Sequence, residues 1–195
     1  LLIILAEAPD ETAFAGADIN FCSQDNQLSL ALNATQNALG SWSQSLNQAN
    51  QGVTIDSVTH AQTSIEGIEP NRVYTFIWSL STAECPDFSS DEVTVNITET
   101  PNQLAFIEMS EMNPMCNEPH FNLDADPPAV GYGTWSTPSG AMIINPSAAS
   151  TTVQNLDLGE NVMIWSLSHE ACLDYSSDTI VIYNEDLDAN DDNFG

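Results

Sequence analysis

An internal repeat is the feature of this 195-residue sequence that most restricts its fold. The segment at residues 77–91 recurs at residues 164–178, an offset of 87, and ten of the fifteen aligned positions are identical. Upstream, GSWS at residues 40–43 corresponds to GTWS at residues 133–136, and Cys22 corresponds to Cys116. A chain that repeats itself at this period is built of tandem modules.

Within each copy, apolar residues alternate with polar ones, which is the period of β-strands. Every second residue from Tyr74 to Leu80 is a large apolar one, and Met163, Trp165 and Leu167 repeat the pattern. A turn-rich Asp-aromatic-Ser-Ser-Asp stretch and a second alternating run follow in both copies, which predicts a hairpin. Short strands at this spacing over ~85 residues match a small antiparallel β-sandwich. We therefore predict an all-β chain of two tandem sandwiches.

The repeat register also predicts the domain boundaries. Residues 9–100 are expected to form the first repeat and residues 101–185 the second. Residues 1–8 are expected to be the last strand of a preceding repeat plus its linker, and residues 186–195 an acidic linker into a following module. On this interpretation the segment lies inside a longer array.

The charge of the chain restricts its partners and its setting. One cation, Arg72, stands against 28 Asp and Glu residues, for a net charge of −27. Such a charge repels phosphate groups, so nucleic acid is excluded as a partner. The five apolar residues at 1–5 are far short of the ~20 that span a bilayer, so direct membrane insertion is not expected. Unpaired carboxylates suit a salty medium and four cysteines suit an oxidising one, which predicts an extracellular or cell-surface location.

A candidate calcium site lies in the C-terminal segment, where oxygen ligands gather. Its residues are Asp186, Asp188, Asn190, Asp191 and Asp192. The segment starts like an EF-hand loop, but the match fails at the sixth position, which is Asp191 instead of glycine. A solvated acidic linker is the favoured interpretation, and calcium is the one candidate cofactor.

The four tryptophans recur in register. Trp78 and Trp165 lie on strongly alternating strands, which favours a place in the core. Trp42 and Trp135, flanked by Gly and by Ser or Thr, are candidates for stacking on a sugar, although a repeated core is the simpler interpretation.

Catalysis is not expected. The sequence has no Gly-x-Ser-x-Gly elbow, no lysine for Schiff-base chemistry and no glycine-rich phosphate loop. His60, His120 and His169 have no partner at metal-ligand spacing. We predict that the chain is not an enzyme.

The paired cysteines, the Gly-x-Trp motifs at Trp42 and Trp135 and the Cys residues followed by Ser-Ser-Asp carry a family resemblance. The chain resembles the immunoglobulin-like, PKD-like tandem repeats of large secreted or cell-surface, adhesin-type proteins of gliding and marine Bacteroidota-type bacteria. The resemblance covers nearly the whole chain. It implies two tandem immunoglobulin-like (PKD-like) antiparallel β-sandwiches that act as spacers and adhesive stalks.

The disulfide prediction follows from comparison with such domains. In the antibody-type pattern the second cysteine lies in mid-strand, whereas Cys85 and Cys172 follow their strand tryptophan by seven residues and fall in the hairpin. We predict the pairs Cys22–Cys85 and Cys116–Cys172, each worth about 4 kcal/mol. The cross-pairing Cys22–Cys172 with Cys85–Cys116 is allowed by counting, but it ties two repeats together and the repeat symmetry disfavours it.

The predicted function is that of a structural and adhesive repeat segment of a giant extracellular surface protein. The segment forms a stiff stalk, or part of a surface filament or appendage, used for attachment. Expected partners are the neighbouring repeats of the same chain, with lateral self-assembly and a surface ligand or glycan as further candidates. The alternative is a carbohydrate-binding accessory module of a secreted enzyme, which requires exposed Trp42 or Trp135.

Overall fold

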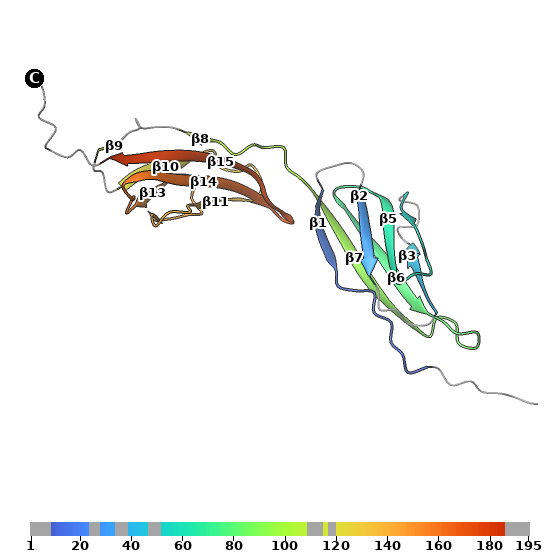
Figure 1. The fold of residues 1–195 in the computed structure, drawn as a ribbon. Coiled ribbons are helices and arrows are strands. Elements are labelled where there is room, and N and C mark those ends of the chain that lie inside the picture. The colour runs from blue at the N-terminus through green and yellow to red at the C-terminus, as the bar shows by residue number, and fades with distance from the viewer. Residues whose placement is uncertain are drawn as a thin grey trace, which may run out of the picture. The chain divides into compact units, whose positions relative to one another are not determined.

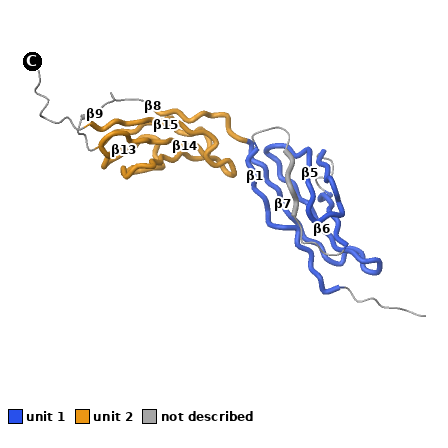
Figure 2. The backbone as a smooth tube through the Cα atoms, viewed as in Figure 1, with its two compact units in different colours: residues 1–99 blue, residues 100–195 orange. Residues whose placement is uncertain are grey.

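The computed structural model describes residues 9–23, 28–33, 39–46, 52–108, 115–116 and 120–185. Two compact units, residues 1–99 and 100–195, make up the chain (Figure 2). Every extended regular element among the described residues is a strand, so the all-β prediction is confirmed (Figure 1). No helix long and apolar enough to cross a membrane occurs among these residues. The expectations for residues 1–8 and 186–195 lie outside the described residues.

Unit 1 has two sheets. The first has four strands in the order β1-β7-β6-β3, and the second has three in the order β2-β5-β4. The strands are β1 (Ile19–Ser23), β2 (Leu28–Asn33), β3 (Gly40–Gln44), β4 (Thr54–Ile55), β5 (Gln62–Ile68), β6 (Arg72–Leu80) and β7 (Ser89–Glu99). β1 pairs in parallel with β7, whereas β6 pairs antiparallel with both β7 and β3. The first and last strands of the unit are therefore neighbours.

Unit 2 repeats this plan with two four-stranded sheets, in the orders β11-β14-β15-β9 and β12-β13-β10-β8. The strands are β8 (Ile107–Glu108), β9 (Met115–Cys116), β10 (His120–Ala125), β11 (Tyr132–Ser136), β12 (Met142–Ile143), β13 (Thr151–Gln154), β14 (Gly159–His169) and β15 (Cys172–Glu185). β9 again pairs in parallel with the last strand, β15. Both units thus place a short edge strand, β1 or β9, beside the strand that ends the unit.

Each unit has its own apolar core between its two sheets. In unit 1 the inward residues of β6 are Tyr74, Phe76, Trp78 and Leu80, and they pack with Ile65 from the other sheet. In unit 2 the corresponding core joins β14 and β15 to β10 and β13. The alternation expected from the sequence is therefore the burial pattern that the strands show.

Candidate functional site

The four tryptophans form one cross-strand pair in each unit. Trp42 on β3 lies opposite Trp78 on β6, with ring centroids 5.1 Å apart and planes inclined at 50°. Trp135 on β11 lies opposite Trp165 on β14 at 5.1 Å and 42°. Tilted ring pairs of this kind stabilise a core beyond their buried area. The repeat thus reproduces the same packing in both units.

The sugar-stacking hypothesis for Trp42 and Trp135 is wrong. The two residues are only 3% and 2% exposed, so no ring face is open to a ligand. Each indole N–H is also satisfied within the fold, from Trp42 to the His60 carbonyl at 3.1 Å and from Trp135 to the Ala149 carbonyl at 3.1 Å. Both residues belong to the cores.

The glycine of each Gly-x-Trp motif makes room for the paired tryptophan. A Cβ atom on Gly40 would lie 1.9 Å from Cζ2 of Trp78, and one on Gly133 would lie 2.1 Å from Cζ2 of Trp165. Real Cβ atoms do not approach another atom so closely. The motif is therefore a packing device, because the ring on the neighbouring strand occupies the space of a side chain.

The recurring Ser-Ser-Asp motif holds the segment that leads into each unit. In unit 1 the N–H groups of Ala13 and Ala15 donate to Ser89 Oγ and Asp91 Oδ2, both at 2.9 Å. Unit 2 makes the same pair of bonds, from the Ala105 N–H to Ser176 Oγ at 2.9 Å and from the Ile107 N–H to Asp178 Oδ2 at 2.8 Å. We call each set the Ser-Asp latch. Its partners are more than 70 residues apart in sequence, and no local pattern reveals them.

We expect Asp178→Ala to loosen the latch of unit 2. The Ile107 amide would lose a charged acceptor that is partly buried, a loss worth about 1.5–3 kcal/mol. Faster hydrogen exchange at the Ile107 amide and a lower denaturation midpoint are the expected results. Asp178→Asn keeps an acceptor oxygen and should lose less. Unchanged exchange at Ile107 in Asp178→Ala would contradict this assignment.

A second Ser-Asp pair recurs in the two units, and it closes the turn of the hairpin that contains a cysteine. Ser81 Oγ accepts the N–H of Asp87 at 2.9 Å, and Ser168 Oγ accepts the N–H of Asp174 at 2.9 Å. Both aspartates take a left-handed backbone, with φ of 48° and 47°. The two hairpins are therefore built alike, around Cys85 in one unit and Cys172 in the other.

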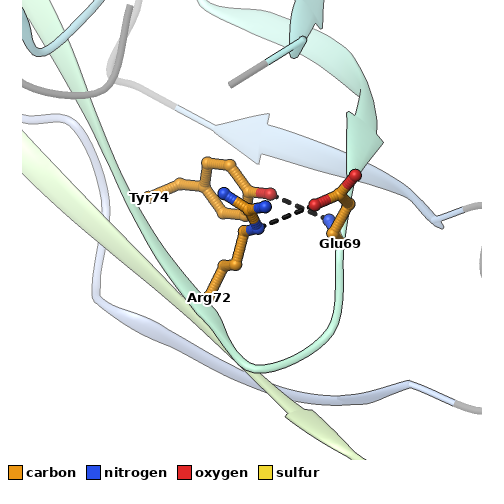
Figure 3. Close-up of polar contacts among 3 residues, drawn as sticks. All are labelled: Glu69, Arg72 and Tyr74. Carbon is orange, nitrogen blue, oxygen red and sulfur yellow. Dashed lines mark hydrogen bonds and ion pairs between the residues drawn. The ribbon is translucent and has the colours of Figure 1, made fainter. Parts of the chain in front are cut away.

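In each unit a side chain from the long central strand, β6 or β14, hydrogen-bonds the turn that precedes that strand. Tyr74 accepts the Glu69 N–H on its hydroxyl at 2.9 Å, beside an ion pair of 2.7 Å between Arg72 Nε and Glu69 Oε2 (Figure 3). This arrangement matches the tyrosine corner of immunoglobulin-like sandwiches. At the equivalent position of unit 2, the buried Asn161 accepts the Asp157 N–H at 2.9 Å and donates to the Asp157 carbonyl at 2.8 Å. Tyr74 and Asn161 are different side chains, but each accepts a backbone N–H from the turn that precedes its strand.

The Arg72–Glu69 ion pair and the Tyr183–Glu160 hydrogen bond are both exposed. The Arg72–Glu69 pair has both side chains about half exposed, and such pairs contribute roughly 0–1 kcal/mol. Tyr183 donates its hydroxyl proton to Glu160 Oε1 at 2.7 Å, and this bond together with the carboxylate charge raises the pKa of Tyr183 above its ordinary value. Among the described residues no group of three His, Cys, Asp or Glu could hold a metal ion. The candidate calcium residues 186–192 lie outside the described residues.

The predicted pair Cys22–Cys85 is wrong. Cys22 lies opposite Thr98, near the end of β7, whereas Cys85 precedes the start of β7 at Ser89. Nine residues of extended strand separate Ser89 from Thr98, which is about 30 Å. A disulfide requires Cα atoms roughly 4.4–6.8 Å apart. Cys85 is a free thiol.

The predicted pair Cys116–Cys172 is wrong for the same reason. The backbone of Cys116 lies opposite Glu185, the last residue of β15, and Cys172 is the first residue of that strand. Thirteen residues of strand span about 43 Å. Both intramodule pairs thus fail because their cysteines lie at opposite ends of the sandwich.

Cys22 and Cys172 are both disulfide-bonded. Of the alternative cross-pairing, the Cys85–Cys116 bond is wrong because Cys85 is a free thiol. Among the residues that the structure describes, the cysteines have a defined chemical state, free at Cys85 and disulfide-bonded at Cys22 and Cys172.

Comparison with known proteins places the fold. No family model and no curated protein matches the chain. Among solved structures, the chain is similar to the fibronectin(III)-like modules of Clostridium thermocellum CbhA, with 9% identity, a TM-score of 0.55, and coverage of 90% of this chain and 95% of that one. Weaker likenesses include a titin I-band fragment (13% identity, TM-score 0.41, 92% and 66% covered) and the D00-D0 domain of intimin (12%, 0.36, 88% and 96%). The likeness to CbhA shows the fold alone, and that fold is immunoglobulin- and fibronectin III-like.

Proposed function

We propose that this chain is a load-bearing repeat segment of a large extracellular surface protein, forming a stalk that serves attachment. One observation carries the proposal, which is that β1 and β7 are adjacent and parallel in unit 1. The disulfide and the immunoglobulin-like fold support an extracellular setting. No observation favours the rival carbohydrate-binding module, because both tryptophans that it needs are buried.

The strand geometry decides how tension acts on the unit. The chain enters before β1 and leaves after β7, so pulling the two ends apart slides these strands along each other. Five register pairs, from Ile19↔Val95 to Ser23↔Glu99, then carry the load together. Asp18 Oδ1 adds a bond from the Thr94 N–H at 2.8 Å. Shearing many hydrogen bonds at once requires more force than opening them singly.

The residues that the two repeats share also have structural roles. The tryptophan pairs, the motif glycines, the Ser-Asp latches and the hairpin Ser-Asp bonds all act inside a unit. A repeated binding site would instead place shared residues on an exposed surface. The surface charge, in turn, keeps neighbouring molecules apart.

Single-molecule pulling of the reduced and alkylated chain tests the proposal. One geometry pulls the N-terminus against a handle after Glu99, and the control pulls it against Asp87 in the hairpin. Pro9 and Glu11 lie beside Ser81 and Phe88, so the control loads one end of the sheet and peels β1 away. We expect unit 1 to unfold at a clearly higher force in the first geometry. Equal forces would overturn the load-bearing assignment.

Light scattering tests the stalk against a laterally assembled filament. The alkylated chain is measured in high salt, with millimolar Ca²⁺ and again with chelator. A monomer in both conditions supports the stalk. A species that grows with Ca²⁺ and reverts on chelation would overturn the stalk in favour of a filament subunit.

A further inference from the structure

We propose that unit 2 bears tension on the segment through which the chain enters it, residues 103–108, and not on the contact between β9 and β15. We call residues 103–108 the entry segment of unit 2. The inference rests on the proposed stalk function, and it names the contacts that carry the load in the second unit. Three features of unit 2 support it, which are the bonds of the entry segment to both sheets, its direction and its register.

The entry segment is hydrogen-bonded to both sheets of unit 2. The latch bonds tie every second residue of the segment to β15. On the other side, the Phe106 carbonyl accepts the Asp126 N–H at 2.9 Å, and β8 pairs antiparallel with β10. Ile107 is only 6% exposed and belongs to the core of the unit. The segment therefore cannot leave its place without breaking bonds to both sheets.

Gln103 anchors the start of the entry segment. Its side-chain amide donates through Nε2 to the Pro127 carbonyl at 3.1 Å and accepts the Ala129 N–H on Oε1 at 2.7 Å. Both partners lie in the loop that directly follows β10. Because the chain passes Gln103 before it reaches any other residue of the segment, tension meets this pair of bonds first.

The direction of the entry segment determines how its bonds are loaded. From the first latch bond to the second, the chain advances by two residues in the entry segment and by two residues in β15. The segment therefore runs parallel to β15, and the chain leaves the unit at the end of that strand. Pulling the two ends of the unit apart slides the segment along β15, so the latch bonds are loaded together in shear.

The register of the entering chain differs between the two units. In unit 1 the latch and the β1–β7 ladder share one register, in which each entering residue pairs with the residue 76 positions later. In unit 2 the separation is 71 positions at the latch and 69 at β9. The entering chain is therefore two residues longer than its partner strand between Ile107 and Met115, which supplies up to about 7 Å of slack. Tension that the entry segment holds is thus not passed on to β9, whereas the latch and β1 of unit 1 are pulled taut together.

Constant-force measurements on the reduced and alkylated chain test this assignment, with handles before Thr100 and after Glu185 so that only unit 2 is loaded. The unfolding rate under force reports the contacts that break in the forced transition. Asp178→Ala removes one charged acceptor of the entry segment, and Gln103→Ala removes both bonds of its anchor. A double variant, Met115→Pro with Cys116→Pro, removes both backbone donors of β9.

Asn161→Ala is the matched control, because it removes buried hydrogen bonds that lie outside the load path. The Asn161 side chain bonds Asp157 and Gly159, at the turn that leads into β14. Denaturant titration measures how much stability each variant loses without force. The control therefore separates a load-bearing contact from one that only stabilises the fold.

The expected result is that Asp178→Ala unfolds about 10–100-fold faster than the unaltered chain at the same force, since a bond to a carboxylate is lost. Gln103→Ala should also unfold faster. Asn161→Ala should lower the denaturation midpoint while its unfolding rate under force changes by less than about threefold. The double proline variant should keep the force response of the unaltered chain.

Equal acceleration under force in Asn161→Ala and Asp178→Ala would overturn the assignment. A larger effect of the double proline variant than of Asp178→Ala would overturn it too. Should the double proline variant not fold, the comparison of Asp178→Ala with Asn161→Ala decides alone. Unit 1 is outside the load path in this geometry, so this test and the test of the β1–β7 contact can fail independently.

Discussion

Before reduction, a thiol reagent such as iodoacetamide is expected to modify Cys85 and to leave Cys22 and Cys172 unmodified. Cys85 is a free thiol, whereas Cys22 and Cys172 are disulfide-bonded and have no thiol to react. After reduction, Cys22 and Cys172 should react as well. Mass spectrometry of the chain alkylated before and after addition of a thiol reductant measures this difference directly.

One substitution separates this result from the intramodule pairing. Cys85→Ser should leave Cys22 protected from the reagent, because Cys85 is free and Cys22 is bonded. If the bonds were Cys22–Cys85 and Cys116–Cys172, Cys85→Ser would leave Cys22 with a reactive thiol. Modification of Cys22 in the unreduced variant would therefore contradict the assignment.

Local patterns predicted the strands well. The alternation from Tyr74 to Leu80 reflects burial of every second side chain, and this is a property of each residue and its near neighbours. The exact repeat of the hairpin likewise reflects bonds within it, between Ser81 and Asp87 and between Ser168 and Asp174. Such short-range causes leave a signal in the sequence.

The failure of the two intramodule cysteine pairs could not be read from the sequence, for a geometric reason. Repeat symmetry shows which cysteines are equivalent, but not whether two cysteines of one repeat can meet. That depends on which end of the sandwich each cysteine occupies. The parallel pairing of β1 with β7 decides that, by placing Cys22 beside Thr98. The Ser-Asp latch is hidden in the same way, because it joins strands that are distant in sequence.

A methyl group at the motif glycine should destabilise unit 2 more than any other small change considered for that unit. In Gly133→Ala the new Cβ would lie 2.1 Å from Cζ2 of Trp165, so the indole must move by more than 1 Å to restore a contact distance of about 3.5 Å. The ring is fully buried, tilted against Trp135 at 5.1 Å, and its Nε1 donates to the Asp126 carbonyl at 3.2 Å. Overpacking of a rigid core site costs about 3 kcal/mol or more.

Gly140→Ala is the matched control, because its Cβ would meet nothing closer than Asp157 Oδ2 at 3.7 Å. We expect the control to change the free energy of unfolding by less than about 0.5 kcal/mol, whereas Gly133→Ala should lower the melting temperature of unit 2 by roughly 12–24 °C. Calorimetry of the reduced chain measures both, with the transition of unit 1 as an internal reference. If Gly133→Ala melted like the control, Trp165 would have room to move, and the Gly-x-Trp motif would lose its explanation as a packing device. A loss of stability in Gly133→Ala alone would show why the glycine and the tryptophan pair recur together. The buried Trp165 ring fits only beside a residue without a Cβ atom.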